Sequence, residues 1–103
     1  MDYSVLNYHP DRSVVLSGNF TFGDTQKFKA IIDSACSDRV QSITLDFAKV
    51  EFIDSVGLGM MLLLRNQCQE NNISINVGGA GGQVEKMFIL SKFDQLFPIK
   101  GKD

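Results

Sequence analysis

Histidine, cysteine and tryptophan are scarce in this chain of 103 residues, which has one His, two Cys and no Trp. A single histidine, His9, excludes a triad of histidines and a histidine-rich metal site. Cys36 and Cys68 stand far apart in no CxxC pair, which argues against both a disulfide framework and a zinc site. We therefore expect buried thiols, no metal site and no cofactor.

An excess of one charge and long hydrophobic runs are also missing. Ten basic residues stand against twelve acidic ones, giving a net charge of −2 and a pI of about 5.2. Nucleic-acid binding domains carry a basic patch, so this balance gives no case for a nucleic-acid partner. No apolar run approaches the about 20 residues of a membrane span, so we expect no direct membrane insertion. Residues 1–4 lack the features of a signal peptide, and we expect a cytoplasmic protein.

Apolar residues make up 44% of the chain, and eight of them are Phe, which is enough for one core. Alternating patterns predict strands over 3–8, 13–20, 42–47 and 73–77, and a short edge strand over 96–99. Helical spacing predicts an amphipathic helix after Asp24, a second from Ser55 to about Glu70, and a third around 84–90.

This order of elements predicts the α/β class, with a mixed sheet of about five strands and helices mainly on one face. The opening hairpin supplies antiparallel pairing, and the strand–helix–strand units supply parallel pairing. No linker, repeat or low-complexity tract divides the sequence, so we expect residues 1–103 to form one domain.

The segment that enters the second helix carries the most information about chemistry. Ser55 stands where a helix N-cap belongs, and a cap hydrogen bond of about 1 kcal/mol would by itself explain a serine there. Gly57 and Gly59 lie in the first turn, where each costs about 0.5–1 kcal/mol relative to Ala. Two missing side chains would leave bare backbone beside the Ser55 hydroxyl, which favours the approach of a partner's active site. A phosphate on Ser55 would meet free N–H groups and the positive end of the helix dipole.

Three aspartates accompany this segment. Asp54 either has a functional role, in which it orients the Ser55 hydroxyl or binds a partner's metal or basic group, or it bonds local amides; the sequence leaves both open. We expect Asp46 to end the third strand and tie down the connection that follows. We expect Asp24 or Thr25 to cap the first helix, and Asp24 at its start can lie near Ser55 in a sheet of this order.

The second helix continues with five consecutive apolar residues at 60–64, more than one buried stripe needs. Those expected to face the core are Met60, Leu63, Leu64 and Cys68. Those expected to lie toward a flank are Leu58, Met61 and Leu62. This flank is either part of a deeply buried helix or an adaptable apolar contact patch next to Ser55, a use that suits Met.

A glycine cluster at 78–82 follows the fourth strand. It contains no GxxxxGK[ST], and a GxGxxG fingerprint fails because Val84 occupies the third glycine position. The cluster therefore predicts a turn from strand to helix rather than a nucleotide loop.

The stretch from 45 to 59 resembles the signature of the STAS domain, the family of bacterial anti-sigma factor antagonists. The family pattern has an aspartate after a hydrophobic strand, a hydrophobic–x–aromatic–hydrophobic run, and then Asp-Ser/Thr-x-Gly-Leu. Here these are Asp46, Val-Glu-Phe-Ile at 50–53 and Asp-Ser-Val-Gly-Leu at 54–58. The resemblance covers nearly the whole chain. Family members often have a further C-terminal helix, whereas this sequence ends soon after Ile99.

The resemblance implies partner switching without enzymatic activity of the chain itself. The unphosphorylated protein would bind an anti-sigma factor, which is often also the serine kinase that phosphorylates the motif serine, here Ser55. A metal-dependent serine phosphatase would remove the phosphate. Val56 stands where many relatives have another Ser or Thr, which narrows the phosphorylation site to Ser55. The resemblance and the residues together predict these partner contacts: Asp24, Asp54, Ser55, Val56, Gly57, Leu58, Gly59, Met61 and Leu62.

Two other functions compete with this interpretation. STAS domains also serve as assembly subunits that are not phosphorylated, for example in lipid-transport complexes, and a serine at position 55 favours the switch over that role. A small hydrolase or nucleotide-binding enzyme would use Asp54, Ser55 and the glycine turn. It would lack a base near Ser55, because the single histidine is distant in the sequence.

Overall fold

The computed structural model describes residues 1–8, 11–35, 40–97 and 99–101. The strands are β1 (Asp2–Tyr8), β2 (Asp11–Phe20), β3 (Ser42–Ile53), β4 (Ser74–Ala80) and β5 (Ile99–Gly101). The α-helices are α1 (Thr25–Ala35), α2 (Ser55–Glu70) and α3 (Gly82–Leu90), and the 3-10 turns are η1 (Phe22–Asp24) and η2 (Phe93–Gln95). The predictions for His9 and Cys36 fall outside the described residues, whereas Cys68 is buried as expected.

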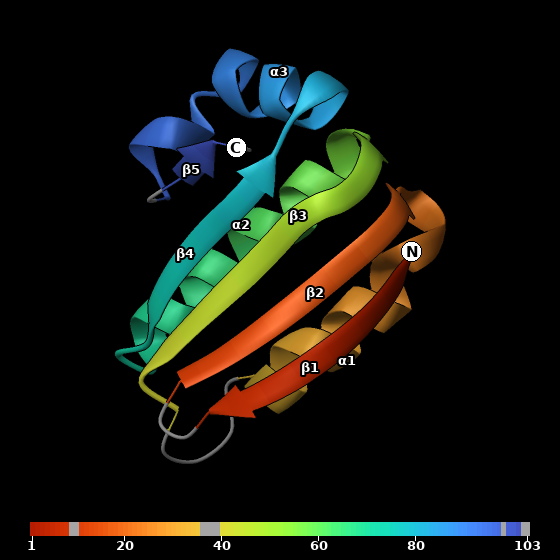
Figure 1. Cartoon of the computed structure of the whole chain (residues 1–103). Helices are drawn as coiled ribbons and strands as arrows, with labels where there is room; N and C mark the ends of the chain where they lie inside the picture. Colours follow the sequence, from red (N-terminus) through yellow and green to blue (C-terminus); the bar gives the residue numbers. More distant parts are fainter. Residues whose placement is uncertain (9–10, 36–39, 98, 102–103) are drawn as a thin grey trace.

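The strands form one mixed sheet in the order β1-β2-β3-β4-β5. β1 and β2 pair antiparallel as the predicted hairpin, and the three other pairs are parallel. Four strands have seven or more residues, and the edge strand β5 has three. Figure 1 shows α1 and α2 behind the sheet and α3 at the end of the molecule toward which β4 points. The predicted mixed α/β architecture is therefore confirmed.

The core lies between the sheet and the helices because every second residue of the strands is apolar. From the strands it receives Val14, Leu16, Ile43, Leu45, Phe47 and Val77. From the helices it receives Phe28, Ile31, Met61, Leu64, Val84 and Phe88. The rings of Phe47 and Phe88 meet edge to face with centroids 5.4 Å apart, which packs α3 against β3.

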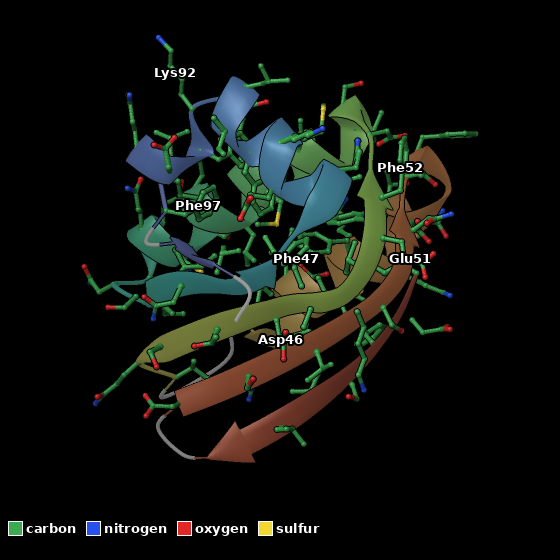
Figure 2. All side chains as sticks on the ribbon, turned by 45° about the horizontal axis from the view of Figure 1, so that its top comes forward. Asp46, Phe47, Glu51, Phe52, Lys92 and Phe97 are labelled. Atoms are coloured by element: carbon green, nitrogen blue, oxygen red, sulfur yellow. The ribbon has the colours of Figure 1, made fainter. Side chains whose placement is uncertain are left out.

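β3 is longer than the sequence predicts, because it continues through 48–53, which we expected to be a connection. Lys49 and Glu51 interrupt the apolar alternation, but both are exposed and lie on the part of β3 that extends past its pairing with β4; Figure 2 shows Glu51 there. Asp46 therefore does not end the strand. Its Oδ1 accepts the Ala48 N–H at 2.9 Å where β3 bulges against β2, so it does tie down the local backbone.

The C-terminal segment also differs from the prediction of a strand over 96–99. Leu96 and Phe97 follow η2, where the Phe97 N–H donates to the Phe93 carbonyl at 2.8 Å, and β5 begins only at Ile99. Phe97 is buried, with its ring centroid 5.4 Å from that of Phe93 (Figure 2). Packing of these two rings, rather than sheet pairing, accounts for the apolar residues here.

Candidate functional site

Asp54, not Ser55, is the N-cap of α2. Its backbone is extended (φ −103°), and its Oδ1 accepts the Gly57 N–H at 2.8 Å. The prediction that Ser55 occupies the cap is thus wrong by one residue. Either side chain can cap a helix, and here the carboxylate of Asp54 makes the bond. Ser55 becomes the first helical residue, and its hydroxyl does not serve as the cap.

The second oxygen of the Asp54 carboxylate holds η1. Oδ2 accepts the Phe22 N–H at 3.0 Å, and the Asp54 backbone N–H donates to the Phe20 carbonyl at 3.2 Å. Of the two interpretations that the sequence left open, the structure shows the carboxylate bonded to local amides. One side chain therefore fixes η1 against the start of α2.

Ser55 and Val56 are exposed at the tip of α2, and Val56 has 40% of its surface accessible. The first N–H groups of a helix have no intrahelical acceptor, and in α2 the Asp54 carboxylate accepts that of Gly57. The N–H groups of Ser55 and Val56 thus stand at the positive end of the helix dipole, where an anion is favoured.

The two glycines of the first turn have different roles. A Cβ on Gly57 would come within 2.8 Å of both Ile53 Cγ1 and the Phe20 carbonyl oxygen, so only glycine lets α2 approach the end of β2 this closely. Gly59 is exposed, and a Cβ there would meet nothing within 4 Å. The expected bare backbone next to Ser55 is found at Gly59 and not at Gly57.

The core-facing side of α2 differs from our expectation. Leu58 and Met61 are 8% and 0% exposed, whereas Leu63, expected in the core, is 46% exposed. Leu64 and Cys68 are buried as predicted, and Leu62 is 36% exposed on a flank. A run of five apolar residues does not show which side of a helix faces the core. In α2 the close approach at Gly57 determines that side, and Met61 and Leu64 lie on the same side. The side chains of Leu58 and Met61 are therefore packed inside rather than presented to a partner.

A group of apolar side chains lies near Ser55, on η1 and on the flank of α2 opposite Leu62. Val56, Met60 and Leu63 share this flank by their spacing of four and three residues. Phe22, held by Asp54, is 74% exposed at the start of α2. We call these four residues the η1–α2 surface. An open hollow of about 350 Å³ adjoins it, lined by Met60, Leu63 and three residues of α1, which are Thr25, Gln26 and Lys29. Phe22 was not predicted, although an exposed aromatic beside a helix start is typical of contact surfaces.

Asp24 lies within η1 and is 8% exposed. Its Oδ2 accepts the Thr21 N–H at 2.9 Å, and its Oδ1 pairs with the Met1 ammonium at 2.9 Å. Burial opposes ionisation of Asp24, but the Thr21 hydrogen bond and the ammonium outweigh it and lower the pKa of the carboxyl below its ordinary 3.8. Asp24 thus closes η1 rather than capping α1, and it supports Phe22 from within.

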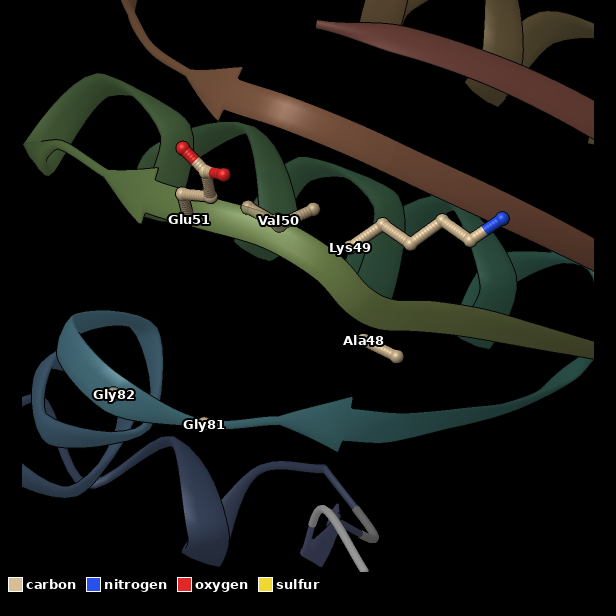
Figure 3. A pocket seen from close by; sticks show the side chains of 6 residues that line it. All are labelled: Ala48, Lys49, Val50, Glu51, Gly81 and Gly82. Atoms are coloured by element: carbon tan, nitrogen blue, oxygen red, sulfur yellow. The ribbon is translucent and has the colours of Figure 1, made fainter.

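A second open hollow, of about 500 Å³, lies between the extended end of β3 and the turn into α3 (Figure 3). It is lined by residues 48–51 of β3 and by Gly81 and Gly82. Gly82, like Gly79, has a positive φ, which makes the predicted turn from strand to helix. Within the described ranges, no three His, Cys, Asp or Glu side chains gather as a metal site, and no helix is both long and apolar enough to span a membrane.

A family described as "Mlab, STAS domain" matches residues 9–98 of the chain. The chain belongs to the STAS-domain family. A STAS-domain containing protein of Pseudomonas aeruginosa is 30% identical over 87 residues, which cover 84% of this chain and 85% of the relative. The resemblance in the segment from 45 to 59 therefore identified the family correctly.

Solved structures share this fold at low sequence identity. An anti-sigma factor antagonist from Mycobacterium paratuberculosis has a TM-score of 0.85 at 20% identity, over 96% of this chain and 84% of its own. The phosphorylated form of the Bacillus cell fate determinant SpoIIAA has a TM-score of 0.74 at 17% identity, over 95% and 90%. The STAS domain of a SulP transporter from Vibrio cholerae has 0.68 at 19% identity, over 85% and 70%. At these identities the likeness shows the fold alone.

Proposed function

We propose that this STAS domain is an anti-sigma factor antagonist that switches partners through phosphorylation of Ser55. Without phosphate it binds an anti-sigma factor that is also a serine kinase. The kinase transfers the γ-phosphoryl group of ATP to Ser55 Oγ, whose proton passes to the kinase, and ADP leaves. The phosphorylated domain is released, and a metal-dependent serine phosphatase hydrolyses the ester to restore the hydroxyl and free phosphate.

The observation that carries the proposal is the exposed Ser55 hydroxyl directly after an N-cap made by another residue. Because Asp54 makes the cap bond to Gly57, a phosphate on Ser55 removes no hydrogen bond that starts α2. The exposed backbone at Gly59 leaves room for a kinase to reach the hydroxyl. Ser55 can therefore be modified while the domain stays folded.

The η1–α2 surface gives the partner an apolar face that the phosphate would change. Phe22 and Val56 are 74% and 40% exposed, and both lie next to Ser55 or to its neighbour Asp54. A phosphate adds about −1.5 to −2 charges at this point, beside the Asp54 carboxylate. A partner surface shaped for a neutral hydroxyl would then face a desolvated dianion, which costs binding free energy.

In this proposal the domain is a binder and a substrate rather than an enzyme. The kinase brings ATP and its catalytic base, and the phosphatase brings its metal ions. Both partners act on Ser55 from outside, which fits a hydroxyl at the tip of a helix rather than in an enclosed cavity. Such partners would meet the domain in the cytoplasm.

The proposal is tested by incubating the protein with a candidate anti-sigma kinase, ATP and Mg²⁺, and locating phosphate by mass spectrometry. We expect one phosphate on Ser55 and none in Ser55→Ala, which should still bind the kinase. A kinase that binds the protein tightly but leaves Ser55 unmodified would contradict the switch.

The second candidate function is an assembly subunit of a transporter. The family description "Mlab, STAS domain" and the fold shared with a SulP transporter STAS domain favour it. A subunit of this kind would stay bound to its partner for the lifetime of the complex. The variant Ser55→Asp separates the two functions. It should release the partner if Ser55 is a switch, and it should leave the complex intact if the domain is a permanent subunit.

A further inference from the structure

Gln83, in the first turn of α3, hydrogen-bonds to the backbone at the end of β3. Its Nε2 donates to the Ile53 carbonyl at 2.9 Å, and its Oε1 accepts the Ile53 N–H at 2.9 Å. This pair reproduces with one side-chain amide the two bonds that a neighbouring strand would make. Only an amide supplies both the donor and the acceptor, so the contact is specific for the residue type.

β3 has room for this contact because β4 stops short. β4 pairs with β3 only as far as Asp46, whereas β2 pairs with β3 up to Ile53. Past Asp46, the side of β3 that faced β4 borders the hollow shown in Figure 3. Gln83 closes the far end of this side, directly before Asp54.

The peptide unit between Ile53 and Asp54 is consequently held at both ends. Gln83 binds the Ile53 carbonyl, and the Asp54 N–H donates to the Phe20 carbonyl at 3.2 Å on the opposite side of the strand. The next carbonyl, that of Asp54, already accepts the Leu58 N–H at 3.0 Å within α2. A rotation of this planar unit would break one of its bonds, and its orientation sets the direction in which α2 leaves the sheet.

We infer that Gln83 is a positioning residue for Ser55. By holding the last peptide of β3, it fixes the helix start that presents the Ser55 hydroxyl, or a phosphate on it, next to the first N–H groups of α2. A regulatory role for Gln83 rests on the proposed function, whereas its hydrogen bonds to Ile53 do not depend on that function. Through this one side chain, α3 and the hollow beside Gly81 and Gly82 connect to the switch residue.

The test uses the full chain with phosphoserine introduced at position 55 during translation, so that no kinase is needed. Gln83→Met keeps the length of the side chain and removes both hydrogen bonds. Gln95→Met, at an exposed glutamine of η2, is the matched control. The readouts are the second pKa of the phosphate by ³¹P NMR and the exchange rate of the Ile53 amide proton.

In the wild type, the N–H groups at the start of α2 lower the second pKa of the phosphate, whereas the Asp54 carboxylate raises it. Gln83→Met loosens the helix start, so it should raise this pKa above the wild-type value and speed exchange of the Ile53 amide about tenfold. Gln95→Met should change neither. An unchanged phosphate pKa in Gln83→Met, with or without faster exchange, would overturn the positioning role.

Gln83→Glu provides a second test, which still applies if Gln83→Met does not fold. The introduced carboxylate can accept the Ile53 N–H but repels the Ile53 carbonyl, and its protonated form regains a donor. The Ile53 amide signal should therefore move toward its wild-type position as the introduced carboxyl is protonated. An Ile53 signal that does not follow this titration would contradict the inference. Failure of any kinase to modify Ser55 would instead contradict the proposed function and leave these readouts unaffected.

Discussion

Asp54 is the residue on which the geometry of the site depends most. One oxygen caps α2 through Gly57 and the other holds η1 through Phe22. The helix start and the turn that carries the exposed aromatic ring are thus joined by a single carboxylate. In the Asp-Ser pair at 54–55, Asp54 therefore holds the local structure, and its exposed neighbour Ser55 is the residue that we propose to be phosphorylated.

Replacing Asp54 should destabilise the fold by more than the loss of an ordinary surface charge. We expect Asp54→Ala to lower the free energy of unfolding by about 1–2 kcal/mol, because a helix cap and a tie between elements are both lost. Asp33→Ala, at an exposed position of α1, should change it by less than about 0.5 kcal/mol. Urea unfolding measures both, and equal effects would show that the two hydrogen bonds contribute little.

Gly57 and Gly59 make a matched pair within one helical turn. Gly59→Ala should stabilise the protein by about 0.5–1 kcal/mol through helix propensity, since its Cβ enters open space. Gly57→Ala should destabilise it by about 1–3 kcal/mol, because its Cβ would lie 2.8 Å from the Phe20 carbonyl oxygen, a backbone atom that cannot easily move. Thermal unfolding checks the opposite signs. A stabilising Gly57→Ala would mean that α2 does not pack this closely.

Asp24 makes stability depend on pH. The folded state lowers the pKa of its carboxyl, so the stabilisation is fully present above the pKa of the unfolded chain and is lost as the pH falls through the lower folded value. We expect Asp24→Asn to be less stable than wild type at pH 7, and the difference to shrink as the pH falls below about 4. Urea unfolding from pH 7 to pH 3 measures this. A gap that stays constant would show that ionisation of Asp24 is not involved.

At the scale of elements, the spacing of apolar residues predicted the regular helices and strands but missed features that depend on contacts between elements. The three helices and the parallel units are confirmed because apolar stripes and alternation reflect burial directly. The extension of β3 was missed because Lys49 and Glu51 sit on an edge that β4 leaves unpaired. The buried side of α2 depends on a backbone contact at Gly57, which sequence spacing alone does not show.

The site was only partly predictable for similar reasons. Ser55 and Asp54 follow from a compact motif, although the sequence placed the helix cap on Ser55 and the structure places it on Asp54. Phe22 and Gln83 are single residues in no pattern, and each gains its role from an element distant in the chain. Gln83 itself is half-buried in the first turn of α3, and its position in the sequence does not show that its amide meets the end of β3.

The N-terminus of α2 should tolerate negative charge. Ser55→Asp should change the free energy of unfolding by less than about 1 kcal/mol, because the helix dipole favours the carboxylate and partly offsets its repulsion from Asp54. Ser55→Lys, with the same exposure and opposite charge, should be less stable at low salt. Thermal unfolding of the three proteins tests the order. A Ser55→Asp variant that unfolds, or is less stable than Ser55→Lys, would remove the physical basis of a phosphate at this site.

The whole molecule carries little net charge, and the η1–α2 surface lies next to Ser55. Its net charge of −2 would become about −3.5 to −4 with one phosphate at Ser55. The change is concentrated at the tip of α2, next to Asp54, whose carboxylate holds the backbone of the exposed Phe22. In the proposed switch, one phosphate would thus alter the η1–α2 surface without a change of fold.

The η1–α2 surface should bind the partner through Phe22. Phe22→Ala should leave the free energy of unfolding within about 0.5 kcal/mol, since the ring is 74% exposed. The same change should weaken binding to the anti-sigma kinase by about tenfold or more, as loss of an aromatic anchor does. Leu90→Ala, at a 78% exposed position of α3, is the control and should bind normally. Calorimetric titration that finds no difference between the two variants would move the partner surface elsewhere.

The most direct measurement is the site and extent of phosphorylation of this protein isolated from its own cells, determined by mass spectrometry under several growth conditions. Partner switching predicts phosphate on Ser55, in a fraction that changes with the conditions, and none in cells that carry Ser55→Ala. A protein that binds its partner under every condition without phosphate on Ser55 would contradict the proposed switch.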